Sequence, residues 1–409
     1  MPQPYFGLSV ERLDGNITNV VWSDMSVVGL VGTAPDAVAA TFPVDTPVMF
    51  SSSDADMLTA LGASGTLPDA LKLINAQMGE FNSSARVILV RVTEGADADE
   101  TIANIIGDSI STGMFALLDA PAELGVTPRL IAVPGYTSQF TAPDANPVCA
   151  ALPEICEKLL AHAVVDAPAT TVAEVISWRE TIGSDRLIAV HPAVRVYDGG
   201  ETVVMPASPA VLGIAVRRDA EKGGRPSHSW ANQQVFGILG PSQPLRFSIT
   251  DGSVDSQVIL AANVGVIIRS EFGADSSLAD GGFLFVGTDN LGTEDLWQFY
   301  NVTRLRDYIN LMMIKTVRGY LGKFNLTKQT VQAIINTMNE GLATLKGNGA
   351  ILGYRVSFNP DVNSVSDLRQ GHLTVTFQAE EAPVLRQVTI QSGRYETAVE
   401  QLLADLAAA

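Results

Sequence analysis

Buried strands alternate with helices over the first half of the chain, and this alternation restricts its fold more than any other feature. Continuous apolar runs, typical of strands covered on both faces, lie at 26–35, 85–92, 127–135, 163–168 and 185–192. Helical segments of roughly 10–15 residues separate several of these runs. Because parallel strands need crossovers of this length, the pattern predicts a mainly parallel, covered α/β sheet between residue 25 and about residue 225.

The pattern changes within residues 217–232, where Gly223, Gly224 and Pro226 interrupt it, and we place a domain boundary at residue 225. Beyond it we expect a strand-rich stretch, a long helix from Glu294 to about Leu321, and a second helix from Lys328 to about Lys346. Three strands should follow, with the sequences AILGYRVSF, GHLTVTFQA and VLRQVTIQ. The expected fold class is therefore α/β and α+β in several domains.

The second of these helices has the clearest pattern. Its apolar residues recur at helical spacing, at Val331, Ile334, Ile335, Met338, Leu342 and Leu345. Thr327 is the expected N-cap. We interpret the stripe as a core-facing surface.

Composition limits the functions open to the chain. Its 26 Lys and Arg against 44 Asp and Glu give a net charge of −18, which disfavours direct nucleic-acid or anionic-membrane binding. No apolar run is long enough to span a bilayer, and no signal peptide is recognisable at the start. We therefore expect a soluble protein, made in the cytoplasm and not inserted in a membrane. Cys149 and Cys156 are expected to be small buried residues.

The usual signatures of catalysis are missing. The segment VGLVGTAP has Gly29 and Gly32 but lacks the third glycine of a dinucleotide fingerprint. The chain contains no nucleophile elbow, C-x-x-C or H-E-x-x-H motif, and its four histidines are scattered. We therefore assign no catalytic, cofactor-binding or metal-binding residues. An α/β enzyme with a β-rich oligomerisation domain remains the alternative.

One segment runs against the acidic charge of the chain. Residues 301–328 hold six cations and one acid, Asp307. On a helix, Arg304, Lys315 and Arg318 share one face with this acid. The face is either an ordinary solvated surface or a docking strip for an acidic partner.

Strands are also expected at the two ends of the chain, at residues 5–12 and 384–391. Phe6, Leu8 and Val10 alternate in the first, and the apolar residues of the second are Val384, Leu385, Val388 and Ile390. The preceding strand alternates at Leu373, Val375 and Phe377, as a sheet with one solvated face does. Terminal strands with free edges fit strand addition between chains.

Seven segments, in order, resemble the tail sheath proteins of contractile bacteriophages, a family shared with R-type bacteriocins and other contractile injection systems. They are VVGLVGTAP near the start, RLIAVPGY at 129–136, VVDAP at 164–168, VMPASPAVLGIAVRRD at 204–219, NVTRLRDYI, GNGAILGYRVSFNPDVNS, and GHLTVTFQAEEAPVLRQVTI. The segment KGGRPSHSWAN departs from the family pattern, because Pro226 precedes Trp230. No single segment is specific, and their order over nearly the whole chain carries the resemblance.

The resemblance implies a structural protein without enzymatic activity or cofactors. Its copies would form a helical sleeve around an inner tail tube protein, with baseplate and tail terminator proteins as further partners. The sleeve would contract to drive the tube through the target cell envelope. The chain would be assembled in the host bacterial cytoplasm and reside in the virion tail. Genome context, rather than sequence, separates a phage from a bacteriocin or a secretion system.

The resemblance also implies a role for each part of the chain. Residues 1–24 would be an N-terminal arm, 25–225 an inserted, outward-facing α/β domain, 226–382 a C-terminal assembly domain, and 383–409 an arm strand with a short tail helix. The two arms would add strands to the sheets of neighbouring subunits, the C-terminal one beside the neighbour's Leu373, Val375 and Phe377. Arg304, Lys315 and Arg318 would face the tube.

Overall fold

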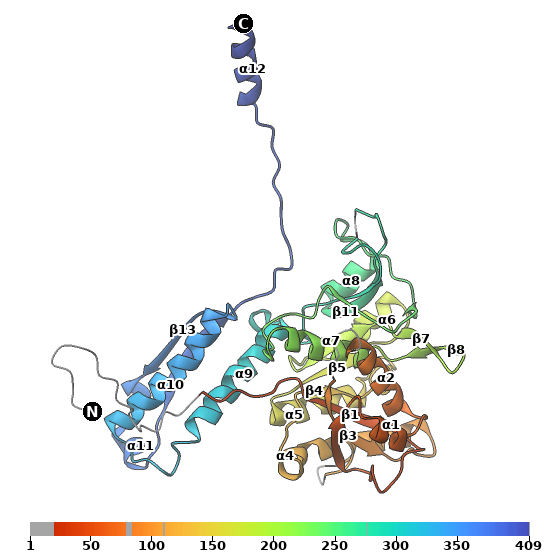
Figure 1. Ribbon diagram of the computed structural model, residues 1–409, viewed down its shortest axis with the longest axis vertical. Helices are drawn as coiled ribbons and strands as arrows, with labels where there is room; N and C mark the ends of the chain where they lie inside the picture. Colours follow the sequence, from red (N-terminus) through yellow and green to blue (C-terminus); the bar gives the residue numbers. More distant parts are fainter. Residues whose placement is uncertain (1–19, 79–83, 109–110, 276, 409) are drawn as a thin grey trace, which may run out of the picture.

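The computed structural model describes residues 20–78, 84–108, 111–275 and 277–408 of the chain. It contains a larger α/β unit, a smaller unit of two long helices and a strand pair, and an extended C-terminal segment (Figure 1). The expected N-terminal strand, with Phe6, Leu8 and Val10, lies outside the described residues.

A nine-stranded sheet forms the centre of the larger unit, in the order β2-β3-β1-β4-β5-β6-β11-β12-β9. Its strands are β1 (Val28–Thr33), β2 (Pro47–Ser51), β3 (Arg86–Val92), β4 (Leu130–Ala132), β5 (His162–Asp166), β6 (Leu187–His191), β9 (Gln233–Gln234), β11 (Val264–Arg269) and β12 (Phe283–Val286). The six central strands from β3 to β11 run parallel, and β2, β12 and β9 pair antiparallel with their neighbours. The mainly parallel sheet expected from the sequence is therefore confirmed.

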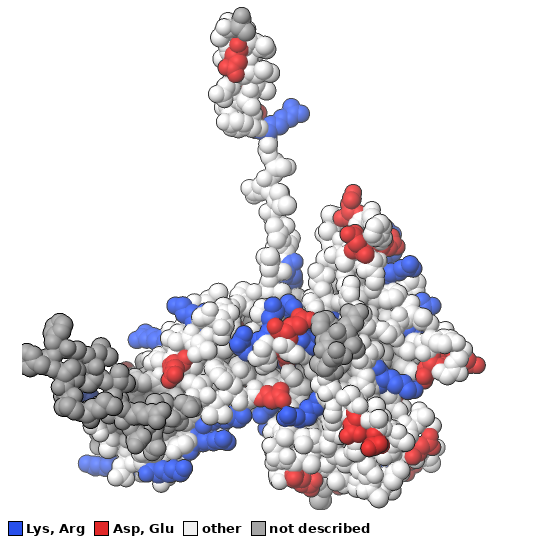
Figure 2. Space-filling view, in the orientation of Figure 1, with Lys and Arg blue, Asp and Glu red and all other residues white. Residues whose placement is uncertain are grey.

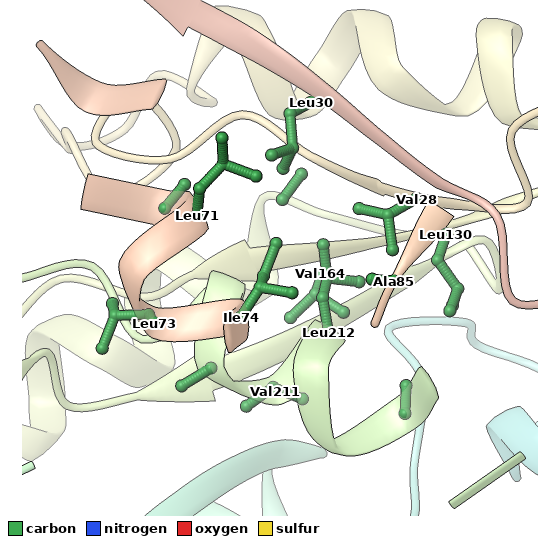
Figure 3. Packing of buried hydrophobic residues seen from close by; sticks show 14 of the residues in the cluster. Val28, Leu30, Leu71, Leu73, Ile74, Ala85, Leu130, Val164, Val211 and Leu212 are labelled. Atoms are coloured by element: carbon green, nitrogen blue, oxygen red, sulfur yellow. The ribbon is translucent and has the colours of Figure 1, made fainter. Parts of the chain in front are cut away.

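Helices cover both faces of this sheet (Figure 1). They are α1 (Ala55–Leu61), α2 (Thr66–Met78), α3 (Ala98–Ile106), η2 (Gly113–Leu118), α4 (Ala120–Glu123), α5 (Pro147–Leu159), α6 (Val172–Glu180), α7 (Ser208–Glu221) and α8 (Asp255–Ala261). On one face α2 and α7 pack on Val28, Leu30 and Val164 (Figure 3). The alternate residues of the same strands pack on η2, α5 and α6 on the other face.

The sheet continues past the boundary that we placed at residue 225. Strands β11 and β12 follow that position in the sequence, yet β11 pairs directly with β6. The interruption at Gly223 and Gly224 is a turn after α7, where both glycines have positive φ (70° and 76°). A local break in the pattern therefore marked the end of a helix rather than the end of a domain.

The smaller unit consists of α9 (Tyr300–Val317), α10 (Lys328–Gly347) and the antiparallel pair β13 (Ile351–Phe358) and β14 (Val375–Glu381). Short helices η3 (Asp295–Trp297), η4 (Pro360–Val362) and α11 (Val365–Arg369) connect its parts. The stripe on α10 is confirmed as core, because Ile334, Met338, Leu342 and Leu345 are buried against α9 and the strands. The Thr327 side chain accepts from the backbone N–H of Thr330, as expected of an N-cap.

Several elements differ from expectation. Helix α9 is shorter than the predicted span of 294–321, because η3 and an extended residue precede it. One of the helical segments between the apolar runs, Gly113–Leu118, is the 3-10 helix η2 rather than an α-helix. A separate three-stranded sheet, not expected, holds β7 (Val194–Asp198), β8 (Glu201–Met205) and β10 (Gly240–Pro241). By contrast, the expectation for Cys149 and Cys156 is confirmed, because both lie buried on α5 and form no disulfide.

The last part of the chain leaves the body as an extended segment (Figure 1). Residues 384–391, expected as a third strand, join no ladder within the described residues. After this segment comes α12 (Thr397–Ala407), far from either unit in Figure 1.

Candidate functional site

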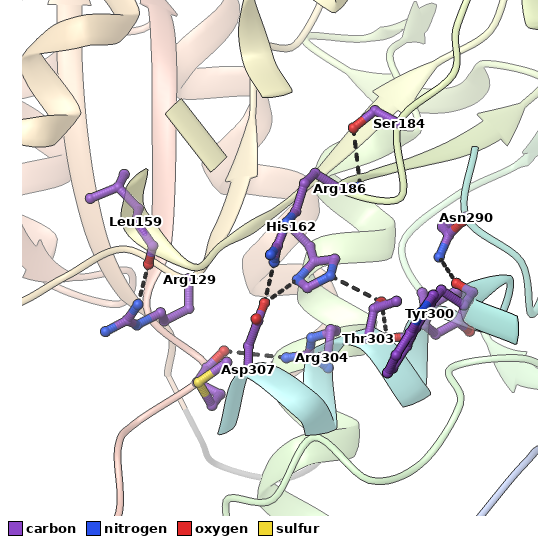
Figure 4. Close-up of polar contacts among 12 residues, drawn as sticks. Arg129, Leu159, His162, Ser184, Arg186, Asn290, Tyr300, Thr303, Arg304 and Asp307 are labelled. Carbon is purple, nitrogen blue, oxygen red and sulfur yellow. Dashed lines mark hydrogen bonds and ion pairs between the residues drawn. The ribbon is translucent and has the colours of Figure 1, made fainter. Parts of the chain in front are cut away.

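Helix α9 is joined to the α/β unit through buried charges, and we call this contact the polar joint (Figure 4). The Arg304 guanidinium donates to both carboxylate oxygens of Asp219, at 3.1 and 2.6 Å, and to the carbonyl of Met25 at 3.2 Å. Both side chains of the ion pair are only 1% exposed. Two segments that carry the family resemblance, VMPASPAVLGIAVRRD and NVTRLRDYI, therefore meet in this pair.

One turn further along α9, Asp307 accepts from Arg186, which lies immediately before β6. Burial raises the pKa of Asp307, and the charge of Arg186 opposes that rise. The pair is therefore a second connection between α9 and the sheet, at the amino end of the central strand β6, and its charges compensate each other.

His162 of β5 completes the polar joint as a neutral side chain. Burial, together with Arg186 and Arg304, holds the pKa of His162 well below its ordinary value. The Nε2 atom of His162 is hydrogen-bonded to the Thr303 hydroxyl at 3.0 Å. Because the ring is neutral, the approach of its Nδ1 to Asp307, at 3.8 Å, is not an ion pair.

An aromatic contact lies beside the polar joint. Tyr300, the first residue of α9, stacks on Trp230 with ring centroids 4.5 Å apart. Its hydroxyl accepts from the backbone N–H of Trp230 and donates to the carbonyl of Gly287, both at 2.8 Å. The Arg304 guanidinium lies over the Trp230 ring at 5.0 Å. The segment KGGRPSHSWAN, which departs from the family pattern, thus supplies the ring on which the start of α9 rests.

The polar joint corrects one of the three predicted tube-facing residues. Arg304 is fully buried, so it cannot contact another molecule. Helical periodicity placed its face correctly, but that face packs on the α/β unit through ion pairs rather than facing solvent. A charged face on a helix cannot be distinguished from a buried polar face by spacing alone.

The other two predicted cations lie near the far end of α9. Lys315 is partly exposed and donates to the carbonyl of Trp22 at 3.3 Å, and burial lowers its pKa. Arg318 is exposed, as are Lys323 and Lys328 in the loop and first turn that follow. Figure 2 shows cations along the lower edge of this unit. An exposed basic surface therefore exists at the α9–α10 connection, and it includes Arg318 of the predicted face together with Lys323 and Lys328.

The proposed receiving sheet has only two strands. Leu373, Val375 and Phe377 are partly buried and point toward α9 and α10, with polar residues between them. In the described part of the chain, β14 pairs only with β13, so each strand keeps one unpaired edge. An unpaired edge offers free N–H and C=O groups to another strand.

The C-terminal segment exposes the apolar residues expected of a strand that pairs elsewhere. Leu385, Val388 and Ile390 are 81%, 66% and 86% exposed, whereas Val384 is partly buried. In α12, Val399, Leu402, Leu403 and Leu406 are 56–66% exposed and recur at helical spacing. The tail helix was predicted from the sequence, but this uncovered apolar stripe was not.

The arm begins at a set of contacts that sequence reasoning missed. Arg306 of α9 makes two ionic contacts to Glu381, at 2.7 and 2.8 Å, and donates to the carbonyl of Ala379. Asn301 donates to the carbonyl of Ala382 at 3.3 Å. These contacts attach the end of β14 to α9, and only the abundance of cations in residues 301–328 pointed toward them.

The crevice where open α/β sheets bind ligands lies here between the carboxyl ends of β1 and β4. Thr66, at the start of α2, fills part of it, and its hydroxyl accepts from the backbone N–H of Thr33 at 3.1 Å. A cavity of about 280 Å³ remains, and its ionisable lining includes the acids Asp69 and Glu94. Two carboxylates disfavour a phosphate group there. Among the described residues no cluster of three or more His, Cys, Asp or Glu could hold a metal.

Comparisons with known proteins agree on one family. Residues 293–392 match the model of the phage tail sheath C-terminal domain. The tail sheath protein of Escherichia phage P2 is 26% identical over 96% of both chains. The major tail sheath protein of Serratia phage KSP20 is 29% identical over 90% of this chain and 89% of its own length.

Solved structures show the same fold. The sheath complex of an extracellular contractile injection system, PVC, in the contracted state matches 97% of this chain and 99% of its own, with a TM-score of 0.70 and 14% identity. The helical sheath of the anti-feeding prophage in the contracted state matches 96% and 99%, with a TM-score of 0.66 and 18% identity. No helix in the described part of the chain is long and apolar enough to cross a membrane.

Proposed function

We propose that this chain, which belongs to the contractile tail sheath family, is the structural subunit of a sleeve that surrounds an inner tube and contracts to drive it through a target envelope. The observation that carries this proposal is the C-terminal arm, which exposes Leu385, Val388 and Ile390 and pairs with no strand of the described chain. The names of the relatives give no support to the alternative of an α/β enzyme.

The arm supplies the link between subunits. Its strand adds to the sheet of a neighbour, beside Leu373, Val375 and Phe377 of β14. A strand of this length makes about 4–8 main-chain hydrogen bonds, each contributing roughly 0.5–1.5 kcal/mol net. One arm therefore contributes several kcal/mol before the cost of ordering it. The N-terminal residues Phe6, Leu8 and Val10 are proposed to form a second such link.

The two units take different positions in the proposed sleeve. The α/β unit, extended to the end of β12, faces outward, and the α9–α10 unit faces the tube with Lys315 and Arg318. The tube is a direct partner, and baseplate and terminator proteins bind the ends of the sleeve. The subunit is assembled in the bacterial cytoplasm and resides in the tail, without contacting nucleic acid.

Removal of the C-terminal arm tests this proposed function. Negative-stain images of the concentrated full-length protein should show long tubular polymers. A variant truncated after Ala382 should stay folded, with a cooperative unfolding transition, and remain monomeric. Small closed oligomers of the full-length protein, or tubes formed equally well by the truncated variant, would contradict the proposal.

A further inference from the structure

The first residues after β14 are held on the subunit's own body, and we call residues 382–386 the arm root. Arg386 donates from one nitrogen to both carboxylate oxygens of Asp289, at 3.1 and 2.8 Å. Its guanidinium also lies over the ring of Phe299 at 5.4 Å. Asp289 and Phe299 are themselves joined by a β-bridge, so the anchor point is part of the segment between β12 and α9.

The ion pair of Arg386 with Asp289 marks where this attachment ends. The Asp289 side chain is 7% exposed, so its charge depends on Arg386 for compensation, and burial raises the pKa of Asp289. Val384 and Leu385 line a groove with Thr288 and Asp289. Exposure does not separate the root from the residues after it, since Leu385 is 81% exposed and Val388 is 66% exposed. Among the described residues, Arg386 is the last one of the arm whose side chain is hydrogen-bonded to the body.

The alternation of side chains along a strand explains why the anchoring of Arg386 matters for assembly. In a strand over residues 384–391, Arg386 would lie on the same face as Val384, Val388 and Ile390. If that face packed on the apolar residues of a neighbour, the guanidinium would be buried there without a counter-ion. The ion pair with Asp289 instead keeps this charge on its own subunit.

We propose that the strand given to a second copy begins at Gln387 and presents Val388 and Ile390 to it, while Arg386 is a positioning residue that fixes where the arm leaves its own body. This rests on the proposed sleeve and sharpens the surface by which its copies bind. A preordered root lowers the entropy lost when the arm binds, so it favours assembly.

Hydrogen exchange of assembled sleeves and of the dilute monomer tests the starting point of the strand. No backbone hydrogen bond is found for the N–H groups of Val384, Leu385 or Arg386 in the described chain. We expect protection gained on assembly to begin at or after Gln387, with residues 384–386 exchanging as in the monomer. Protection of Val384 and Leu385 equal to that of Val388 would overturn the proposal.

Variants test the positioning role. Arg386→Gln should raise the protein concentration needed for sleeve formation roughly three- to tenfold and move protection to earlier residues. Arg386→Lys, which keeps the charge but loses the planar fork, should lie between. Arg394→Gln makes the same charge change beyond the proposed strand and serves as the control. Because Arg386 is half exposed, with 53% of its side chain accessible, the variants should fold.

The outcomes separate this inference from the proposed function. If the unaltered protein forms no sleeves, the function fails. If it forms sleeves and Arg386→Gln behaves as Arg394→Gln does, the function stands and the positioning role of Arg386 is wrong.

Discussion

Asp166, the acid of the segment VVDAP, joins two segments that carry the family resemblance. Its carboxylate accepts from the backbone N–H groups of Ala207 and Ser208, at 2.7 and 2.8 Å, and from the Ser208 hydroxyl at 2.5 Å. These donors form the start of α7, where a negative charge is favoured. Burial nevertheless raises the pKa of Asp166 to about 6.

This pKa gives a prediction for the pH dependence of stability. Because the folded-state pKa lies above the ordinary 3.8, the contribution of Asp166 is full below about pH 4 and is lost as pH rises through about 6. The loss is on the order of 3 kcal/mol. Asp166→Asn should therefore gain stability relative to the parent between pH 4 and pH 7, measured by urea unfolding. An equal difference between the two proteins at both pH values would contradict this.

The ion pair of Arg304 and Asp219 gives a second prediction. Arg304→Ala leaves the buried Asp219 charge uncompensated and should lower the free energy of unfolding by about 3–5 kcal/mol. The double change Arg304→Met with Asp219→Leu should cost less, since no charge is then left unpaired. Arg318→Ala, at an exposed position of the same helix, is the control and should change stability by about 0.5 kcal/mol at most. Similar losses for Arg304→Ala and Arg318→Ala in urea unfolding would show that the polar joint does not stabilise the fold.

At the scale of elements, the predictions for α10 that rested on a pattern within one element were correct, whereas contacts between distant elements were not predicted. The stripe and N-cap of α10 lie within one element, and both were read correctly from spacing. Strands β11 and β12 join the sheet across an interruption in the pattern, and no local signal shows which earlier strand they pair with. The polar joint was missed for the same reason, since Arg304 and Asp219 are 85 residues apart. Residues 384–391 join no ladder for a different reason, because the strand that we propose as their partner lies on another chain.

Helix α12 permits a prediction about an element that has no intramolecular partner in the described structure. Leu402→Ser and Leu406→Ser should each change the free energy of unfolding of the monomer by less than about 0.5 kcal/mol, because these side chains are exposed. Leu342→Ala in the core of α10 should cost about 2–5 kcal/mol in the same urea titration. A loss at Leu402 comparable to that at Leu342 would mean that α12 packs on the body in solution.

At the scale of the whole molecule, the distribution of charge sets how the subunit meets its partners. The chain has a net charge of −18, yet Arg318, Lys323 and Lys328 are exposed together at the α9–α10 connection. Arg304 and Arg306 are engaged in internal ion pairs, so they leave the basic surface smaller than the sequence predicted. We therefore expect the α9–α10 unit, rather than the acidic remainder of the molecule, to meet an acidic partner.

Charge reversal at Lys315 and Arg318 tests whether that partner is the tube. The double variant Lys315→Glu with Arg318→Glu should fold as the parent does, but give prematurely contracted tails or tube-free sleeves when produced with the inner tube protein. Lys346→Glu with Arg369→Glu changes the same number of charges at other exposed positions and is the control. Because the screening length falls from about 10 Å at 0.1 M salt to about 3 Å at 1 M, high salt should affect the parent in the same direction. Normal extended tails from the Lys315 and Arg318 variant, seen by electron microscopy, would exclude this surface as the tube contact.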